Sequence, residues 1–300
     1  MLEHIEPTPR DPARVVVIGA GGFVGGTIAR ALDAARIDVL RLTRREVDLL
    51  APGAADVLRA MLRPTDSVVA VSALAPAKNN AMLMQNLQMA HAMCEAVSAV
   101  PPAHLVYVSS DAIYADDANP VTEQSPAAPS TIHGMMHAAR ELMLRSASPA
   151  PFAALRPTLI YGAADPHSGY GPNRFRRQAL KGEPITIFGE GEERRDHVLV
   201  DDVAALAILL LRRRSVGALN AVTGTSVAFC DVAGMVAAQF SPAAQVLSVP
   251  RPGPRPHLLH RHFDVTNCLK AFPGFRYTSL AEGIARVHRA VTGRPATEKA

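Results

Sequence analysis

A twelve-residue segment near the start of the chain, VVVIGAGGFVGG at positions 15–26, limits the fold more than any other feature. Four consecutive β-branched apolar residues predict a buried parallel strand, and the glycines predict a tight turn into a helix over 27–34. Glycine is needed there because the turn adopts backbone angles that a side chain forbids, and because a bound pyrophosphate must approach the main chain. The free N–H groups at the start of the helix would face that phosphate. The segment therefore predicts dinucleotide binding.

The same alternation of strand and helix continues along the chain. Apolar runs predict strands over 38–42, 47–49, 67–72, 105–110 and 152–160. Helical spacing predicts helices over 54–62, 82–100, 133–144, 174–181, 231–239 and 280–290. Strands that alternate with helices form a parallel, doubly wound α/β sheet, in which ligands bind outside the carboxyl ends of the strands.

Composition excludes several classes of protein. No apolar run reaches the roughly 18 residues that span a bilayer, and residues 1–12 lack the layout of a secretory signal, so we expect a cytoplasmic protein with no membrane association. Cys94, Cys230 and Cys268 are odd in number and far apart, which fits a reducing compartment and core packing. The net charge of +4 is mild and the arginines are scattered. Nucleic acid is therefore disfavoured as a partner, and an anionic small molecule is favoured.

The residues after the second predicted strand bear on the choice between NAD and NADP. In a dinucleotide-binding fold, an acidic residue near this point binds the ribose hydroxyls of NAD, whereas arginine accommodates the 2′-phosphate of NADP. Arg44 and Arg45 stand here in place of the acid. We therefore expect NADP. The alternative, two solvated surface arginines, leaves NAD open.

Four motifs follow one another in a characteristic order: GxxGxxG at 19–25, YVSSDAIY at 107–114, LRPxxIYG at 155–162 and FGEGxxRRDHVxVDDV at 188–203. Together they resemble the extended short-chain dehydrogenases/reductases, the NAD(P)-dependent epimerase/dehydratase group. The resemblance covers about 14–291 and implies a doubly wound (Rossmann) nucleotide lobe with a smaller C-terminal α/β substrate lobe. The nucleotide lobe would comprise 1–162, completed by about 198–222. The substrate lobe would comprise 163–197 and 223–291, and 292–300 would be a flexible tail.

The resemblance also implies which residues bind cofactor and substrate. Nucleotide-linked sugars are the commonest substrates of the group, and dimerisation through two helices is usual in it. The positions that would touch the cofactor diphosphate are Gly19, Gly22, Phe23, Val24 and Gly25; those near the adenine and adenosine are Asp48, Leu49, Ala73 and Leu74, with Asn86 as a supporting asparagine. The positions that would bind substrate are Asp111, Asn173, Arg195 and Arg251. For Arg195, an ion pair with Asp196 or Asp201 is the alternative to binding a diphosphate.

The sequence departs from the group at the catalytic pair. Ser110 occupies the position of the catalytic Ser or Thr, but His133 and His137 replace the Tyr and Lys of Tyr-x-x-x-Lys. Spacing i, i+4 places both imidazoles on one helical face. Neutral His133 could accept the carbinol proton and protonated His133 could return it, while Ser110 bonds the same oxygen and His137 bonds the nicotinamide ribose. Two close imidazoles should make activity sensitive around pH 6–7.

Two other interpretations of the histidine pair stay open. Histidines at i, i+4 can bind zinc, but Gly134 stands where the metalloprotease pattern has Glu and a third ligand is lacking, so we expect no metal. The histidines could instead line a retained NADP pocket in a protein without turnover, a redox sensor or structural partner.

The residues after Ser110 bear on the reaction type. By the same resemblance, sugar dehydratases place Asp and Glu after the catalytic threonine, whereas this chain has Asp111 and then Ala112. Ketone reduction or epimerisation is therefore favoured over dehydration. We expect an NAD(P)-dependent oxidoreductase or epimerase that acts on a nucleotide-activated sugar or a related hydroxyl compound.

Overall fold

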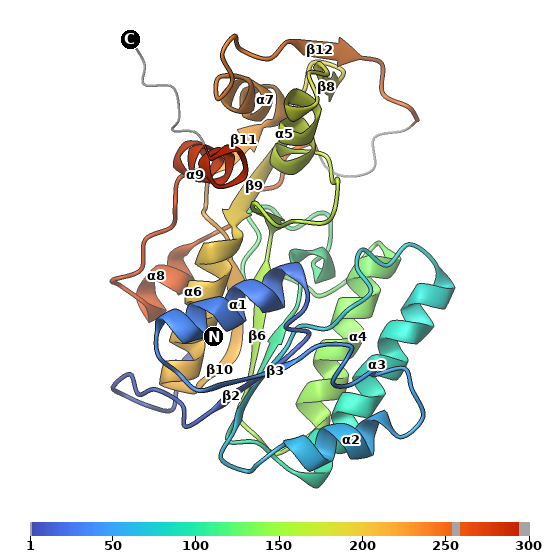
Figure 1. Ribbon diagram of the computed structural model, residues 1–300, viewed down its shortest axis with the longest axis vertical. Coiled ribbons are helices and arrows are strands. Elements are labelled where there is room, and N and C mark those ends of the chain that lie inside the picture. Colours follow the sequence, from blue (N-terminus) through green and yellow to red (C-terminus); the bar gives the residue numbers. More distant parts are fainter. Residues whose placement is uncertain (1, 254–258, 294–300) are drawn as a thin grey trace.

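The computed structural model describes residues 2–253 and 259–293. Its centre is a seven-stranded sheet in the order β1-β10-β6-β5-β4-β2-β3 (Figure 1). All neighbours are parallel except β1, which runs antiparallel to β10. The strands are β1 (Glu3–His4), β2 (Val15–Ile18), β3 (Val39–Leu42), β4 (Ser67–Ala70), β5 (His104–Val108), β6 (Phe152–Pro157) and β10 (Ser215–Ala221). The doubly wound parallel sheet expected from the sequence is confirmed.

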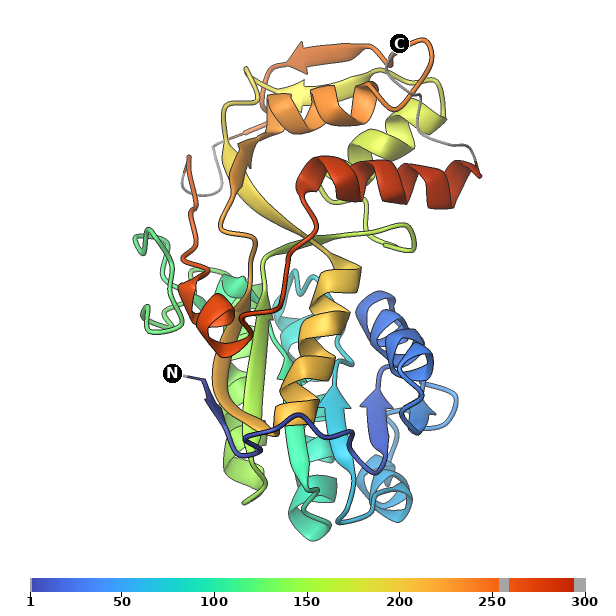
Figure 2. The same ribbon diagram turned by 90° about the vertical axis from the view of Figure 1, so that its left-hand side faces the viewer.

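Helices cover both faces of this sheet. The side chains of β2 alternate between the two layers: Val15 and Val17 join one buried cluster, and Val16 and Ile18 join the other. The first cluster is closed by α1 (Phe23–Ala34), α6 (Val200–Arg213) and α8 (Thr266–Ala271), and the second by α2 (Ala54–Met61), α3 (Asn80–Ala99) and α4 (Ile132–Ala147). Figure 2 shows α1, in blue, and α6, in yellow-orange, on the same face.

A smaller group of elements lies beyond the carboxyl ends of the strands, at the top of Figures 1 and 2. It has a three-stranded sheet in the order β11-β9-β7 and a pair of strands, β12 and β8. The bounds are β7 (Leu159–Tyr161), β8 (Ile185–Phe188), β9 (Arg194–Leu199), β11 (Ser226–Ala228), β12 (Val246–Val249), α5 (Pro172–Leu180), α7 (Phe229–Ala237) and α9 (Leu280–Thr292). A third hydrophobic cluster joins the three helices.

The structure corrects two predicted strands. Residues 47–49 form no strand: Val47 and Leu49 are buried in the second cluster, but the backbone turns, and the N–H of Val47 donates to the carbonyl of Thr43. Buried and less buried residues alternate in this turn as they would in a strand, which is why the sequence predicts a strand here. The predicted strand over 152–160 is two strands in different sheets. The break follows Pro157, which has no N–H to continue a ladder.

The remaining boundaries differ less. Helix α1 begins at Phe23, four residues before its predicted start, because Gly22 is extended and serves as its N-cap. Helix α9 continues to Thr292, and of the predicted tail over 292–300 only 292 and 293 are among the described residues. The three cysteines form no disulfide; Cys268 is buried, and Cys94 and Cys230 are half-buried. Within 2–253 and 259–293, no helix is both long and apolar enough for a membrane span.

Candidate active site

The glycine turn after β2 has the shape that a diphosphate requires. Gly19 has φ +101°, and a Cβ there would lie 2.7 Å from the backbone nitrogen of Ser72. A Cβ on Gly25 would lie 2.3 Å from the carbonyl oxygen of Gly19. Helix α1 has no side-chain cap and no acidic residue in its first turn. Its N–H groups and positive dipole end therefore remain available to an anion, and these residues fit the diphosphate of a dinucleotide.

The turn after β3 holds the residues expected near the adenosine. Both Nε and Nη2 of Arg44 donate to the Asp48 carboxylate at 3.2 Å, although the Arg44 side chain is 81% exposed. The N–H of Leu50 also donates to Asp48, and this bond, followed by Arg44, holds the pKa of Asp48 below its usual value. The side chain of Leu49 is buried in the core. The turn that carries Arg44 adjoins the glycine turn, because a Cβ on Gly21 would lie 3.3 Å from the Cβ of Thr43.

The loop after β4, which contains Ala73 and Leu74, is fixed by Asn86 of α3. The amide of Asn86 accepts from the N–H of Leu74 at 2.9 Å and donates to the Leu74 carbonyl at 3.0 Å. Arg140 of α4 donates to the Asn86 oxygen at 3.0 Å and to the carbonyl of Ser72. Its side chain is fully buried. A cation therefore ties the loop to the helix that bears the histidine pair.

Ser110 and the histidine helix meet at one tight contact. Ser110 N-caps the short helix η1 (Asp111–Ile113), where its Oγ accepts from the N–H of Ala112 at 3.1 Å. The first turn of α4 packs on η1, and a Cβ on Gly134 would lie 2.0 Å from the Ala112 carbonyl oxygen. Only glycine fits there. Position 134 thus cannot hold the glutamate of a metalloprotease, and its small size lets the His133 turn reach the Ser110 turn.

The two imidazoles lie together, as their spacing predicts. The rings of His133 and His137 are 4.7 Å apart at their centroids and nearly perpendicular. Nδ1 of His133 accepts a long bond, 3.4 Å, from the N–H of Ala77. Nδ1 of His137 lies 2.8 Å from the hydroxyl of Tyr107, whose pKa burial raises to about 12. Among the described residues, no group of three or more His, Cys, Asp and Glu could hold a metal ion.

Both histidines favour the neutral form. Burial, and secondly His167, lowers the pKa of His133. Burial lowers the pKa of His137 further, with contributions from His133 and Arg140. The expected sensitivity around pH 6–7 therefore moves below the ordinary histidine value of 6.5. Sequence reasoning missed Tyr107 and Arg140, although Arg140 follows His137 at the i, i+3 spacing that places two side chains on one helical face.

The two arginines expected at the substrate diphosphate share one carboxylate. Arg195 lies 3.8 Å from Glu193 and donates to the carbonyl of Leu259, while Arg251 donates to the same Glu193 carboxylate at 2.5 Å. The carboxylates of Asp196 and Asp201, the alternative partners, are engaged elsewhere: Asp196 accepts from the loop at 223–224, and Asp201 lies 4.0 Å from Arg286. Sequence reasoning did not single out Glu193.

Two further expected substrate residues have structural partners. Asn173 donates to Asp165 at 2.7 Å and accepts from the N–H of Gly162, so its amide fixes the segment before α5. Asp111 accepts a 3.4 Å bond from Ser110 and lies 3.9 Å from Arg261. Burial raises the pKa of Asp111. Asp111 lies next to Ser110 in the sequence. The amide of Asn173 is instead engaged by Asp165 and by the backbone of Gly162.

These features define the class of protein. The sequence model of the NAD dependent epimerase/dehydratase family matches residues 15–222, more than half of the chain. The chain belongs to this family, and the resemblance drawn from its motifs is confirmed.

Relatives in sequence and structure agree with this assignment. The rice (Oryza sativa subsp. japonica) protein named "Putative GDP-L-fucose synthase 2" is 28% identical over 230 residues, which are 68% of this chain and 65% of that protein. The match thus spans less than two thirds of that relative. The GDP-L-fucose synthetase of Naegleria fowleri has a TM-score of 0.85 at 15% identity over 96% of both chains, and a crystal structure of that synthetase contains NADP. UDP-N-acetylglucosamine 4-epimerase from Bacillus cereus has a TM-score of 0.79 at 20% identity, over 94% of this chain and 100% of that one. At these identities the solved structures show a shared fold.

Proposed function

We propose that the protein is an NADP-dependent oxidoreductase or epimerase that acts on a nucleotide-activated sugar. The observation that carries the proposal is the contact between the Ser110 turn and the His133 turn beyond the carboxyl end of β5, in a fold whose glycine turn fits a dinucleotide. NADP would lie along Gly19, Gly22, Phe23, Val24 and Gly25, with Arg44 and Arg45 at its 2′-phosphate.

The bound nicotinamide would supply or accept a hydride, and Ser110 and His133 would manage the proton of the substrate oxygen. Because a backbone N–H can only donate, the Ala77 bond makes Nδ1 of His133 the acceptor and leaves the ring hydrogen on Nε2. In that tautomer Nε2 would donate to the substrate oxygen, and the Ser110 hydroxyl would do the same after giving up its long bond to Asp111. Accepting the carbinol proton requires the other tautomer and the loss of a long hydrogen bond, which costs no more than about 0.5–1.5 kcal/mol.

The substrate lobe, 163–197 and 223–291, would supply Arg195 and Arg251 to the sugar-nucleotide diphosphate. We also propose a cytoplasmic homodimer formed through α3 and α4. These helices pack together and expose Met84, Met135 and Leu142.

The test is turnover of keto-sugar nucleotides with NADPH. His133→Ala should abolish it, and Arg59→Ala, which changes an exposed side chain of α2, should leave it unaltered. A second candidate, an NADP-binding protein without turnover, is favoured by the lowered pKa of both imidazoles, because little protonated acid is present at pH 7. NADP binding without turnover of any keto-sugar nucleotide, in the wild type and between pH 5 and 8, would support that candidate instead.

A further inference from the structure

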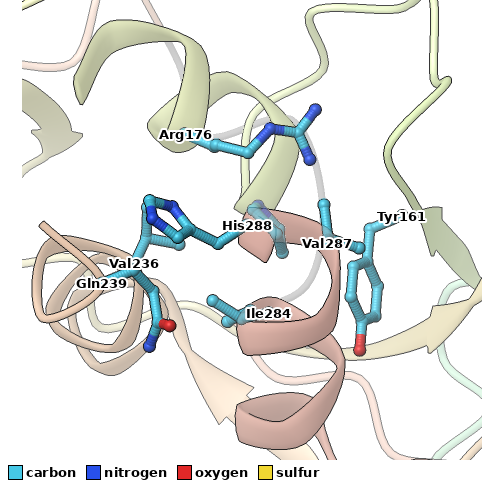
Figure 3. A pocket seen from close by; sticks show the side chains of 8 residues that line it. Tyr161, Arg176, Val236, Gln239, Ile284, Val287 and His288 are labelled. Atoms are coloured by element: carbon cyan, nitrogen blue, oxygen red, sulfur yellow. The ribbon is translucent and has the colours of Figure 1, made fainter. Parts of the chain in front are cut away.

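A small pocket lies among α5, α7 and α9, and its lining includes no residue assigned to the cofactor or substrate. Figure 3 shows Arg176 of α5 above α9, which contributes Ile284, Val287 and His288. The full lining is Tyr161, Pro172, Arg176, Val236, Gln239, Ile284, Val287 and His288. The space that a water-sized sphere can enter is about 10 Å³. This is the size of one water or one monatomic ion.

The Arg176 guanidinium is a buried charge without an ion pair in the described chain. Its side chain is 6% exposed and its Nε has no hydrogen-bond partner there. Nη1 donates only a long bond, 3.4 Å, to the carbonyl of Gly162. The nearby carboxylate of Asp165 is held by Asn173 at 2.7 Å and lies 3.9 Å from Arg177. Burying a charge without a counter-charge costs free energy. An anion beside this guanidinium would reduce that cost.

A second buried donor lies on the same pocket. His288 is 6% exposed, and its Nδ1 has no partner among the described residues. Its ring packs edge-on against Phe240, and burial, followed by Arg176, lowers its pKa. A neutral imidazole can present an N–H from Nδ1. The unpartnered oxygen of Gln239 also belongs to the lining, and in the view of Figure 3 the His288 ring lies between it and Arg176.

We propose that this pocket binds one monatomic anion, chloride being the probe, between Arg176 and His288. Two buried donors supply its hydrogen bonds, and Val236, Ile284 and Val287 supply an apolar wall that limits competing water. Sulfate and phosphate are larger than one water and exceed this space. The ion would join α5 to α9 and stabilise the smaller lobe. This site does not depend on the proposed enzymatic function.

The test replaces sodium gluconate stepwise by sodium chloride at constant ionic strength and follows the apparent Tm. The wild type should show a saturable rise, because a ligand that binds only the folded state stabilises it. Arg176→Met should lose the rise. Lys181→Met, which removes an exposed cation at the end of the same helix, should retain it.

Two results would overturn the proposal. One is an equal chloride response in the wild type and Arg176→Met. The other is an Arg176-dependent response to sulfate that exceeds the chloride response. If Arg176→Met does not fold, crystals of the wild type grown with bromide decide the question. An anomalous peak between Arg176 and His288 supports the site, and water alone at that position excludes it.

Discussion

Replacing Arg44 by alanine should separate the affinities for NADP and NAD. The Arg44 side chain is 81% exposed, and its only carboxylate partner in the described chain is Asp48, in an i, i+4 pair. Exposed ion pairs of this kind contribute little to stability. Breaking the pair with Asp48 therefore costs little compared with the gain from a new bond to phosphate. A hydrogen bond between a guanidinium and a phosphate is worth about 1.5–3 kcal/mol. Arg44→Ala should therefore weaken NADP binding about 10–100-fold and leave NAD binding unchanged, since NAD lacks the 2′-phosphate.

Titration calorimetry with both cofactors measures this difference directly. Arg59→Ala is the matched control, because Arg59 is an exposed arginine of α2 that pairs with Asp56. Raising the salt concentration should weaken NADP binding more than NAD binding in the wild type. Equal losses for both cofactors in Arg44→Ala would refute a contact with the 2′-phosphate. No loss for either would make Arg44 a solvated surface side chain and leave Arg45→Ala as the next variant.

Three other properties can be tested. Burial lowers the pKa of His104 and of His197 to about 4. As the pH falls, the unfolded state therefore binds protons before the folded state does. Below pH 6.5 the free energy of unfolding should fall by about 1.4 kcal/mol per pH unit for each histidine. Urea titrations at pH 7.5, 6 and 5 check this, and a flat profile contradicts it. Arg195→Ala should abolish calorimetric binding of nucleoside diphosphates and spare NADP; a wild type that binds NADP but no diphosphate would remove the assignment. Glu141→Gln should cost about 1.5–3 kcal/mol of stability, because it leaves the half-buried partner Arg156, which lies 2.7 Å from the Glu141 carboxylate, without its counter-charge; a loss under 1 kcal/mol in chemical denaturation would contradict this.

The sheet could be predicted because its signals are local. Four consecutive apolar residues in β2 supply both buried layers, and the glycines after them mark the turn. The two wrong strand predictions have local causes, and a single sequence does not distinguish these cases from true strands. Val47 and Leu49 alternate in burial as a strand would, yet they belong to a turn at the sheet edge. The predicted strand over 152–160 runs through Pro157, although its two halves pair with different strands.

The candidate site was predicted in its parts but not in its electrostatics. Motif positions identified Ser110 and both histidines, because each follows a strand or begins a helix at a fixed spacing. The bonds from Arg140 join residues 54 and 68 positions apart in the sequence. Contacts at such separations depend on the packing of three elements, which periodicity does not encode. Glu193 was missed for a different reason: Asp196 directly follows Arg195 in the sequence, and Glu193 lies 58 positions from Arg251.

The histidine pair and Arg140 are best understood together. Arg140 is fully buried, and its guanidinium carbon lies 5.5 Å from the centre of the Tyr107 ring, whose hydroxyl contacts His137. A lysine at position 137 would put a second cation beside it in a buried place, whereas a neutral imidazole avoids that repulsion. His137→Lys should therefore destabilise the protein by about 3 kcal/mol or more. In a double-mutant cycle, the loss caused by His137→Lys should be at least about 1 kcal/mol smaller when it is measured in an Arg140→Leu background. If the two changes were simply additive in urea denaturation, Arg140 would not be the reason that histidine replaces lysine here.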